Sequence, residues 1–335
     1  MVEALPLDEG WQFEPKWDGF RCLAFRDGRG VELRAKSGKS LTRFFPEVAE
    51  RIAALPEQDF VIDGELVVPS EGSLSFDALQ MRLHPAASRI ARLSREQPAT
   101  LIAFDCLADA KALLIERPLV ERRTKLEGLF TSLGPHQGLD LSPFTRNPSQ
   151  ARRWLLAEPA LDGVIAKRLD EPYRSGERAM LKVKNIRTAD CVVGGFRYES
   201  GRALVGSLLL GLYDPAGLLH HVGFTSGLAA KDKPELTARL EALIERPGFT
   251  GDAPGGPSRW STERSTAWQP LRPELVIEVR YDHVTADRFR HGTRLLRWRP
   301  DKAPQQCTLA QIAPATATGS IATLPGALPS ATTGA

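Results

Sequence analysis

The sequence predicts a two-domain α+β protein, with antiparallel strands and helices over residues 1–187 and a small β-barrel over residues 188–310. Its 335 residues exceed the usual size of one domain. Strand-type alternation and helical spacing interleave in the first part. In the second part, several short strands surround one helix. Residues 311–335 carry no charge and are rich in Ala, Thr, Pro and Gly, which predicts a disordered tail.

Composition excludes several classes of protein. The net charge of +3 is far from that of a polycation, so any nucleic-acid surface must be a local patch. The longest apolar run, 204–213, is too short to span a bilayer, and the N-terminus lacks a signal-peptide pattern. We therefore expect a cytoplasmic protein with no membrane contact. No zinc module is expected, and buried free thiols are expected for the four widely spaced cysteines, Cys22, Cys106, Cys191 and Cys307.

The first domain is expected to alternate strands with helices. Residues 21–25 and 31–33 alternate around the turn 26–30, which predicts a hairpin. Pro46 suits the first turn of a helix, and Ser75 suits the N-cap of another. The same two spacings predict strands at 101–107, 161–167 and 181–184, and helices from Pro118 and around Trp154.

A strand is also expected at 60–68, although Asp63-Gly64-Glu65 interrupts its apolar run. A buried carboxylate costs several kcal/mol unless it is paired or bound to a cation, so an acid inside a strand needs a partner. The alternative is a hairpin turn at Asp63-Gly64, because Asp-Gly is a common turn sequence.

The second domain is predicted from the spacing of its strands. They are expected at 191–198, 204–212, 218–224, 274–281 and 294–299, with a helix at 234–244 and a Pro/Gly loop at 247–257. This order alone does not distinguish an oligonucleotide-binding barrel from other small barrels.

Two charged segments of the first domain carry candidate chemistry. In Glu14-Pro15-Lys16-Trp17-Asp18-Gly19-Phe20-Arg21, Lys16 becomes a nucleophile only if its pKa falls, and Gly19 allows a tight turn or a close approach. A solvated charge cluster is the simpler alternative. Lys182 and Lys184 share one face of a strand, where like charges make most sense opposite an anion.

Chemically unusual residues therefore recur along most of the chain. They are Lys16 with Arg21, Glu65, Phe104, Asp162 leading to Lys167, Lys182 with Lys184, and the cluster Arg297 to Lys302. In this order, the chain resembles a DNA ligase of the covalent nucleotidyltransferase superfamily, and more closely the small bacterial ATP-dependent ligases. The resemblance implies an adenylation domain of ATP-grasp-like antiparallel sheets with helices, followed by an OB-fold.

The resemblance also implies a covalent mechanism. Lys16 would attack the α-phosphate of ATP to form lysyl-N-AMP, and the cations Lys167, Lys182 and Lys184 could lower its pKa from the usual ~10.4. Oxygen ligands suit Mg²⁺ or Mn²⁺, which Glu65 and Asp162 would hold. The remaining contacts are Glu14 with the adenine amino group, Phe104 with the ring, Arg21 with the ribose, Lys36 and Lys167 with ATP, Lys182 and Lys184 with the α-phosphate, and Arg297, Arg299 and Lys302 with pyrophosphate.

Three positions depart from this pattern or allow another interpretation. The family usually has Glu where this chain has Asp162, so a metal contact there could run through water. Lys36 replaces an arginine and cannot bind two oxygens as a fork. Phe104 could instead be an ordinary core residue.

The expected activity is the sealing of nicked duplex DNA through lysyl-AMP and DNA-adenylate intermediates, in an accessory repair role. The alternatives are an RNA ligase or capping guanylyltransferase, which share Lys-x-Asp-Gly, or a DNA-binding module without activity. We expect a monomer near the nucleoid, with possible recruitment by other repair proteins. The start so close to Lys16 and the absence of a zinc module suggest a minimal ligase that binds DNA phosphates.

Overall fold

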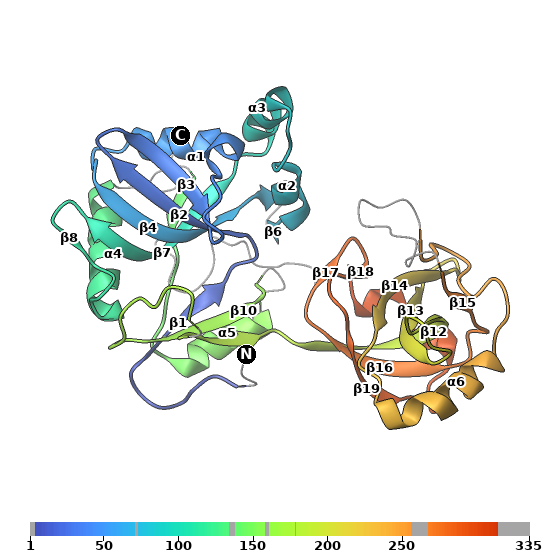
Figure 1. Cartoon of the computed structure of the whole chain (residues 1–335). Helices are drawn as coiled ribbons and strands as arrows, with labels where there is room; N and C mark the ends of the chain where they lie inside the picture. Colours follow the sequence, from blue (N-terminus) through green and yellow to red (C-terminus); the bar gives the residue numbers. More distant parts are fainter. Residues whose placement is uncertain are drawn as a thin grey trace, which may run out of the picture. The chain divides into compact units, whose positions relative to one another are not determined.

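In the computed structural model, the described residues are 4–70, 73–133, 138–157, 161–177, 179–255 and 267–313. They form two compact units, the first ending at Asn185 and the second beginning at Ile186. Figure 1 shows a mixed first unit and a barrel-like second unit. This is the α+β architecture that the sequence predicts, and each unit is described by itself.

The larger sheet of the first unit has the strand order β3-β2-β4-β7-β8, with β9 added in parallel to β7. These strands are β2 (Phe20–Asp27), β3 (Gly30–Ala35), β4 (Phe60–Val67), β7 (Thr100–Asp109), β8 (Ala112–Leu113) and β9 (Leu139–Leu141). The predicted hairpin is confirmed as β2 and β3. A separate two-stranded sheet pairs β5 (Pro69–Ser70) with β6 (Ser73–Leu74).

Helices cover the sheet and close its core. α1 (Pro46–Ala53) packs on β3 and α4 (Leu119–Leu133) on β7, as Figure 1 shows. α2 (Phe76–Met81) begins where predicted, because the Ser75 hydroxyl accepts the Ala78 amide at 3.2 Å. α3 (Ala87–Glu96) was not predicted from the sequence, and it buries only Ile90 and Leu93.

A second sheet of three strands, β1-β10-β11, completes the first unit. Its strands are β1 (Trp11–Lys16), β10 (Gly163–Arg168) and β11 (Leu181–Lys184), and α5 (Pro148–Ala157) packs on β1 and β10. Burial alternates along β11, where Lys182 is exposed and Val183 is buried. Both lysines therefore leave the same face, as the sequence predicts.

The hairpin alternative at Asp63-Gly64 is wrong, because β4 runs unbroken from Phe60 to Val67. Its pairing with β7 shifts register between Asp63 and Gly64, where a bulge absorbs the irregularity. Gly64 is needed here, since an added Cβ would lie 2.6 Å from the Ile102 carbonyl oxygen. A turn-forming dipeptide therefore sits inside a central strand. Asp63 and Glu65 lie on the same face of that strand, because Arg21 is opposite Glu65 in the register and also binds Asp63.

The second unit is a β-barrel of the order β14-β13-β12-β16-β19, with β15 on β12. Its strands are β12 (Arg187–Tyr198), β13 (Val205–Tyr213), β14 (Leu219–Thr225), β15 (Gln269–Pro270), β16 (Val276–Tyr281) and β19 (Arg294–Trp298), with α6 (Lys233–Glu241) and the hairpin β17 (Val284–Thr285) and β18 (Arg288–Phe289). Thr293 donates its amide to the Phe224 carbonyl at 3.0 Å, which links the first and last strands of the sheet. The fold is an OB-fold.

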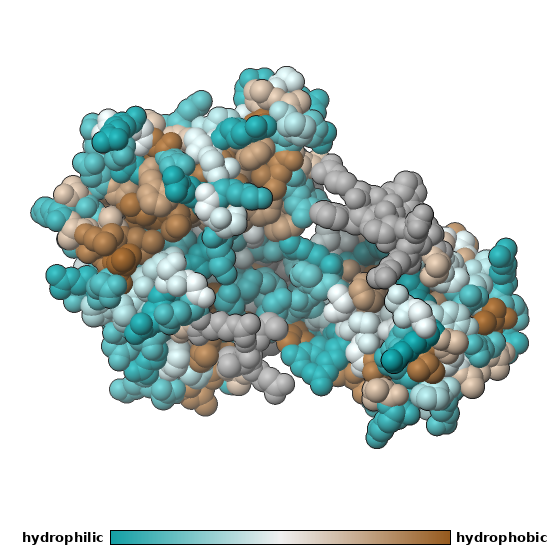
Figure 2. Space-filling model, in the orientation of Figure 1, coloured by the Kyte–Doolittle hydropathy of each residue, from teal (hydrophilic) through white to brown (hydrophobic). Residues whose placement is uncertain are grey.

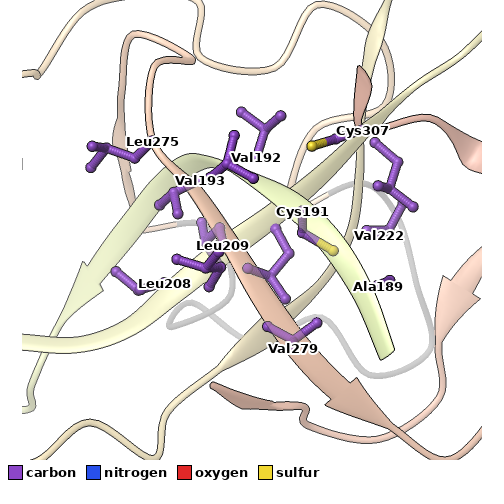
Figure 3. Packing of buried hydrophobic residues seen from close by; sticks show 14 of the residues in the cluster. Ala189, Cys191, Val192, Val193, Leu208, Leu209, Val222, Leu275, Val279 and Cys307 are labelled. Carbon is purple, nitrogen blue, oxygen red and sulfur yellow. The ribbon is translucent and has the colours of Figure 1, made fainter. Parts of the chain in front are cut away.

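The barrel core explains two of the predicted buried thiols. Cys191 and Cys307 are fully buried among Val192, Leu209 and Val279, and Figure 3 shows them pointing into this cluster. All four cysteines are free and buried, as predicted.

The barrel extends slightly beyond residue 310. Ile312 is buried in its core and Gln311 exchanges two hydrogen bonds with the Asp190 backbone, both at 3.1 Å. The rest of the predicted tail, 314–335, lies outside the described residues. Figure 2 shows mainly hydrophilic residues on the visible surface, with hydrophobic patches on the first unit. No helix in the described part of the chain is long and apolar enough to cross a membrane.

We expect a pH-dependent contribution of His220 to the stability of the barrel. Its ring lies 3.1 Å from Asp214 and 3.2 Å from Asp252. Burial lowers the pKa of His220, but the two carboxylates outweigh it, so the pKa lies above its usual value. The protonated ring therefore stabilises the fold below about pH 6.5, and this stabilisation is lost as the pH rises through the folded-state pKa.

The measurement is thermal unfolding of the wild type and of His220→Gln from pH 5 to pH 8. The unfolding temperature of the wild type should exceed that of His220→Gln by the largest difference at pH 5. A difference in unfolding temperature that stays constant or grows with pH would contradict the stabilising role of protonated His220.

Candidate active site

Lys16 lies at the end of β1, where the smaller sheet brings three charged side chains together. The strand pairs with β10 in the register Lys16 to Gly163, which places Lys16 beside Asp162. The Lys16 ammonium forms an ion pair with the Asp162 carboxylate. The Lys184 ammonium lies 3.8 Å from the other carboxylate oxygen, so Asp162 is shared by two lysines.

Glycines allow this close arrangement. A Cβ on Gly163, whose φ is +145°, would lie 2.1 Å from the Val183 carbonyl oxygen. A Cβ on Gly19 would lie 2.2 Å from the Leu66 carbonyl oxygen. Gly19 and Gly163 therefore allow close backbone packing between strands, and a larger residue at either position would push the strands apart.

Glu65 enters the same region from the larger sheet, opposite Arg21 in the pairing of β4 with β2. Burial raises the pKa of Glu65 to about 8, although the charges of Lys16 and Arg21 oppose this shift. A carboxylate buried near an ammonium and a guanidinium is still poorly solvated, and a cation would stabilise its charged form.

Glu65 and Asp162 are therefore both close to Lys16 and offer oxygen ligands only. Among the described residues, no group of three or more His, Cys, Asp or Glu side chains could enclose a metal ion. Such a sparse donor set fits Mg²⁺, which commonly keeps several waters and is held by one or two carboxylates together with substrate phosphates. Zinc, which favours nitrogen and sulfur ligands in a closed site, does not fit.

Lys182 belongs to a cluster of cations that could bind an anion. Its side chain is exposed, and its pKa is lowered first by partial burial and then by the positive charges of Lys16, Arg21 and Lys36. Three cations, from β1, β2 and the turn after β3, thus act on Lys182 of β11. Mutual repulsion of this kind is relieved by a polyanion such as a triphosphate.

A buried polar group lies further along the same face of β1. Glu14 is 2% exposed, accepts a hydrogen bond from the Gln12 amide at 2.7 Å, and pairs with the Lys167 ammonium at 2.7 Å. The Lys167 ammonium also lies 4.7 Å from the centre of the Phe104 ring.

Phe104 differs from an ordinary core residue. It is only partly buried and belongs to none of the hydrophobic clusters of the described residues. Arg21 and Lys167 lie over its ring, at 5.5 and 4.7 Å from the centroid. A partly exposed ring with two cations over it is not packed as an apolar core residue is.

The three basic residues near the end of the chain belong to the barrel and are already paired there. Arg297 donates to Glu278 at 2.6 Å. Arg299 and Lys302 donate to the two oxygens of Asp190, at 2.9 and 2.7 Å. Any role in ATP chemistry requires these cations to leave or share their carboxylates.

Several side chains that hold the site residues in place were not predicted from the sequence. Gln12, Asp63 and Asp190 hold Glu14, Arg21 and the Arg299–Lys302 pair, respectively. Their only sequence signal was polarity within strands that are otherwise apolar. Asp63 was noticed as an oddity, but the sequence did not identify its partner.

This geometry and the OB-fold define the class of protein. Models described as "ATP dependent DNA ligase domain" and "ATP dependent DNA ligase C terminal region" match residues 4–184 and 201–302. The chain belongs to the family of ATP-dependent DNA ligases.

Individual relatives agree with this assignment. The chain is 44% identical over 324 residues to DNA ligase C2 of Mycolicibacterium smegmatis, covering 91% of each chain. It is 32% identical over 310 residues to the multifunctional non-homologous end joining protein LigD of Mycobacterium bovis, covering 88% of this chain and 37% of that protein. A solved Lig E DNA ligase shares the fold with a TM-score of 0.52 and 17% identity, covering 89% of this chain and 100% of that one.

Proposed function

We propose that this chain is an ATP-dependent DNA ligase that seals nicks in duplex DNA and acts in repair. The observation that carries the proposal is the ion pair of Lys16 with Asp162. Lys184 also lies near Asp162, and the charge of Lys16 acts on Lys182. A lysine in such a setting can take up AMP from ATP. The two sheets then correspond to an adenylation domain and the barrel to a DNA-binding domain. The similar DNA ligase C2 is named as a DNA ligase, which favours DNA sealing over the RNA ligase and capping alternatives.

In the first step, Lys16 Nζ forms a bond to the α-phosphorus of ATP, and the bond to the bridging oxygen of pyrophosphate breaks. Asp162 orients the amine, which must lose a proton before the attack. Lys182 and Lys184 offset the negative charge that builds up on the α-phosphate. A divalent cation held by Glu65 and Asp162 would supply further positive charge to the phosphate oxygens.

The nucleotide is oriented by residues on both sheets. Phe104 offers a ring face for adenine, and Glu14, fixed by Lys167, offers an acceptor for the adenine amino group. Arg21 is assigned to the ribose. Lys36 lies in the turn after β3 and acts on Lys182, which supports a place beside the phosphates.

Pyrophosphate release is assigned to Arg297, Arg299 and Lys302 of the barrel. Their ion pairs with Glu278 and Asp190 hold them ordered before use. A polyphosphate competes well for such groups, because its several oxygens accept charge-assisted hydrogen bonds at once.

The later steps act on DNA. AMP passes from Lys16 to the 5′-phosphate of the nick, and the 3′-hydroxyl then displaces AMP to close the strand. We propose that the enzyme works as a monomer at the nucleoid and that other repair proteins recruit it. Contacts with the duplex would be mainly to phosphates, so sealing should weaken as salt rises.

The test is sealing of a nicked DNA duplex and of a nicked all-RNA duplex of the same sequence, each with ATP and Mg²⁺ or Mn²⁺. We expect only the DNA to be sealed. Preferential sealing of RNA would favour an RNA ligase, and AMP attachment without sealing of either duplex would overturn the proposed DNA substrate.

A further inference from the structure

Tyr173 lies in the segment between β10 and β11 and contacts the residue assigned to the ribose. Its hydroxyl donates to Asp63 at 2.8 Å and accepts a hydrogen bond from Arg21 at 3.2 Å. Arg21 also donates its Nε to Asp63 at 3.1 Å. One hydroxyl therefore closes a ring of three side chains from β2, β4 and this segment.

The ring fixes which edge of the Arg21 guanidinium is free. Nε and Nη2 are directed to Asp63 and Tyr173. Within the described part of the chain, Nη1 makes no hydrogen bond, and the Arg21 side chain is 28% exposed. The guanidinium also lies 5.5 Å from the centre of Phe104, on which the base is proposed to stack. Two donors of Nη1 are thus presented beside the base.

Asp63 alone would hold Arg21 less firmly. The Asp63 carboxylate is fully buried and accepts hydrogen bonds from both Arg21 and Tyr173. Burial and the nearby Asp63 raise the pKa of Tyr173, so its hydroxyl remains a donor across the physiological range. Tyr173 thereby supplies Asp63 with a second hydrogen-bond donor and holds the carboxylate that binds Arg21.

Tyr173 is itself held in place by backbone and ring contacts. Its amide donates to the Ile115 carbonyl at 2.8 Å, and Arg122 lies over its ring at 5.8 Å. Arg122 is committed to the buried carboxylate of Asp105, at 2.8 and 3.1 Å. Asp105 is paired with Asp63 across β7 and β4, so Tyr173 connects two neighbouring buried ion pairs.

We infer that Tyr173 is a positioning residue that aligns Arg21 toward the ribose of ATP and so contributes to nucleotide selection. The inference rests on the proposed function, because it takes the ribose contact of Arg21 from it. A correctly aligned arginine binds the ground state and the transition state equally, so its misalignment should affect KM and leave the maximal rate unchanged.

The experiment measures self-adenylation of the full chain with ATP and with 2′-deoxy-ATP, for the wild type and Tyr173→Phe. We expect the KM for ATP to rise by about fivefold to tenfold, the scale of one lost intramolecular hydrogen bond, with the maximal rate within about twofold. Preference for ATP over the deoxy nucleotide should fall. Tyr198→Phe is the matched control, since it also removes one tyrosine–carboxylate hydrogen bond, 2.8 Å to Glu241, but in the barrel.

Two outcomes overturn the inference: an unchanged KM, or equal losses with both nucleotides, as a purely structural role would give. If thermal unfolding shows that Tyr173→Phe is poorly folded, Asp63→Asn is the second variant. It weakens the same ring of hydrogen bonds and should raise the KM for ATP in the same way. A wild-type chain that takes up no AMP would instead contradict the proposed function, so the two failures are distinguishable.

Discussion

Replacing Lys16 with alanine is expected to abolish sealing of a nick that carries an ordinary 5′-phosphate, by a factor of at least about 10⁴. No other side chain of the described site can replace the lost nucleophile, because Lys182 and Lys184 extend from a different strand, β11. The measurement is sealing of nicked duplex DNA with ATP and Mg²⁺. The matched control is Lys111→Ala, an exposed lysine in the turn between β7 and β8.

A nick that already carries AMP on its 5′-phosphate separates chemistry from folding. Its closure needs the 3′-hydroxyl and the binding site but no lysine nucleophile, so Lys16→Ala should still seal it without ATP. A variant that fails on both nicks has lost its structure or its hold on DNA. Normal sealing of the ordinary nick would show that Lys16 is not the nucleophile.

Glu65→Gln is expected to slow AMP attachment by about 10²–10³ while leaving the fold intact. The amide keeps the shape of the side chain but loses the charge that attracts a cation and acts on Lys16. The rate of lysyl-AMP formation at saturating ATP, with increasing Mg²⁺ or Mn²⁺, measures the effect. Glu32→Gln, an exposed acid paired with Arg34 at 2.8 Å, is the matched control.

The same substitution should stabilise the metal-free protein by about 1–2 kcal/mol, because it removes a poorly solvated buried carboxyl group. Thermal unfolding in the presence of a chelator measures this. A stable, slow variant agrees with a residue kept for function rather than for folding. An unstable variant with normal kinetics would contradict that role.

Local patterns predicted most of the fold. The β2–β3 hairpin, the helix that begins at Pro46, the helix that Ser75 caps, and the five longer strands of the barrel follow from alternation and capping residues. α3 was missed because it buries only two residues, so its apolar stripe is too narrow to stand out. The continuity of β4 through Asp63-Gly64 depends on β2 and β7, which lie on either side of it and are distant in sequence.

The charged residues of the site were predictable, but their pairing was not. Lys16 and Asp162 are 146 residues apart, and only the register of β1 with β10 brings them together. Arg299 and Lys302 stand out in the sequence, whereas their shared partner Asp190 does not, since one acid near the start of a strand is unremarkable. Tyr173 has no motif signal, and its position between Asp63 and Arg21 emerges only when the sheet is folded.

The most direct test of the covalent mechanism is peptide mass spectrometry after incubation of the wild-type chain with ATP and a divalent cation. We predict one AMP per chain, attached through the side-chain nitrogen of Lys16 and removed by added pyrophosphate. AMP on Lys167, Lys182 or Lys184, or no AMP under conditions in which nicks are sealed, would contradict it.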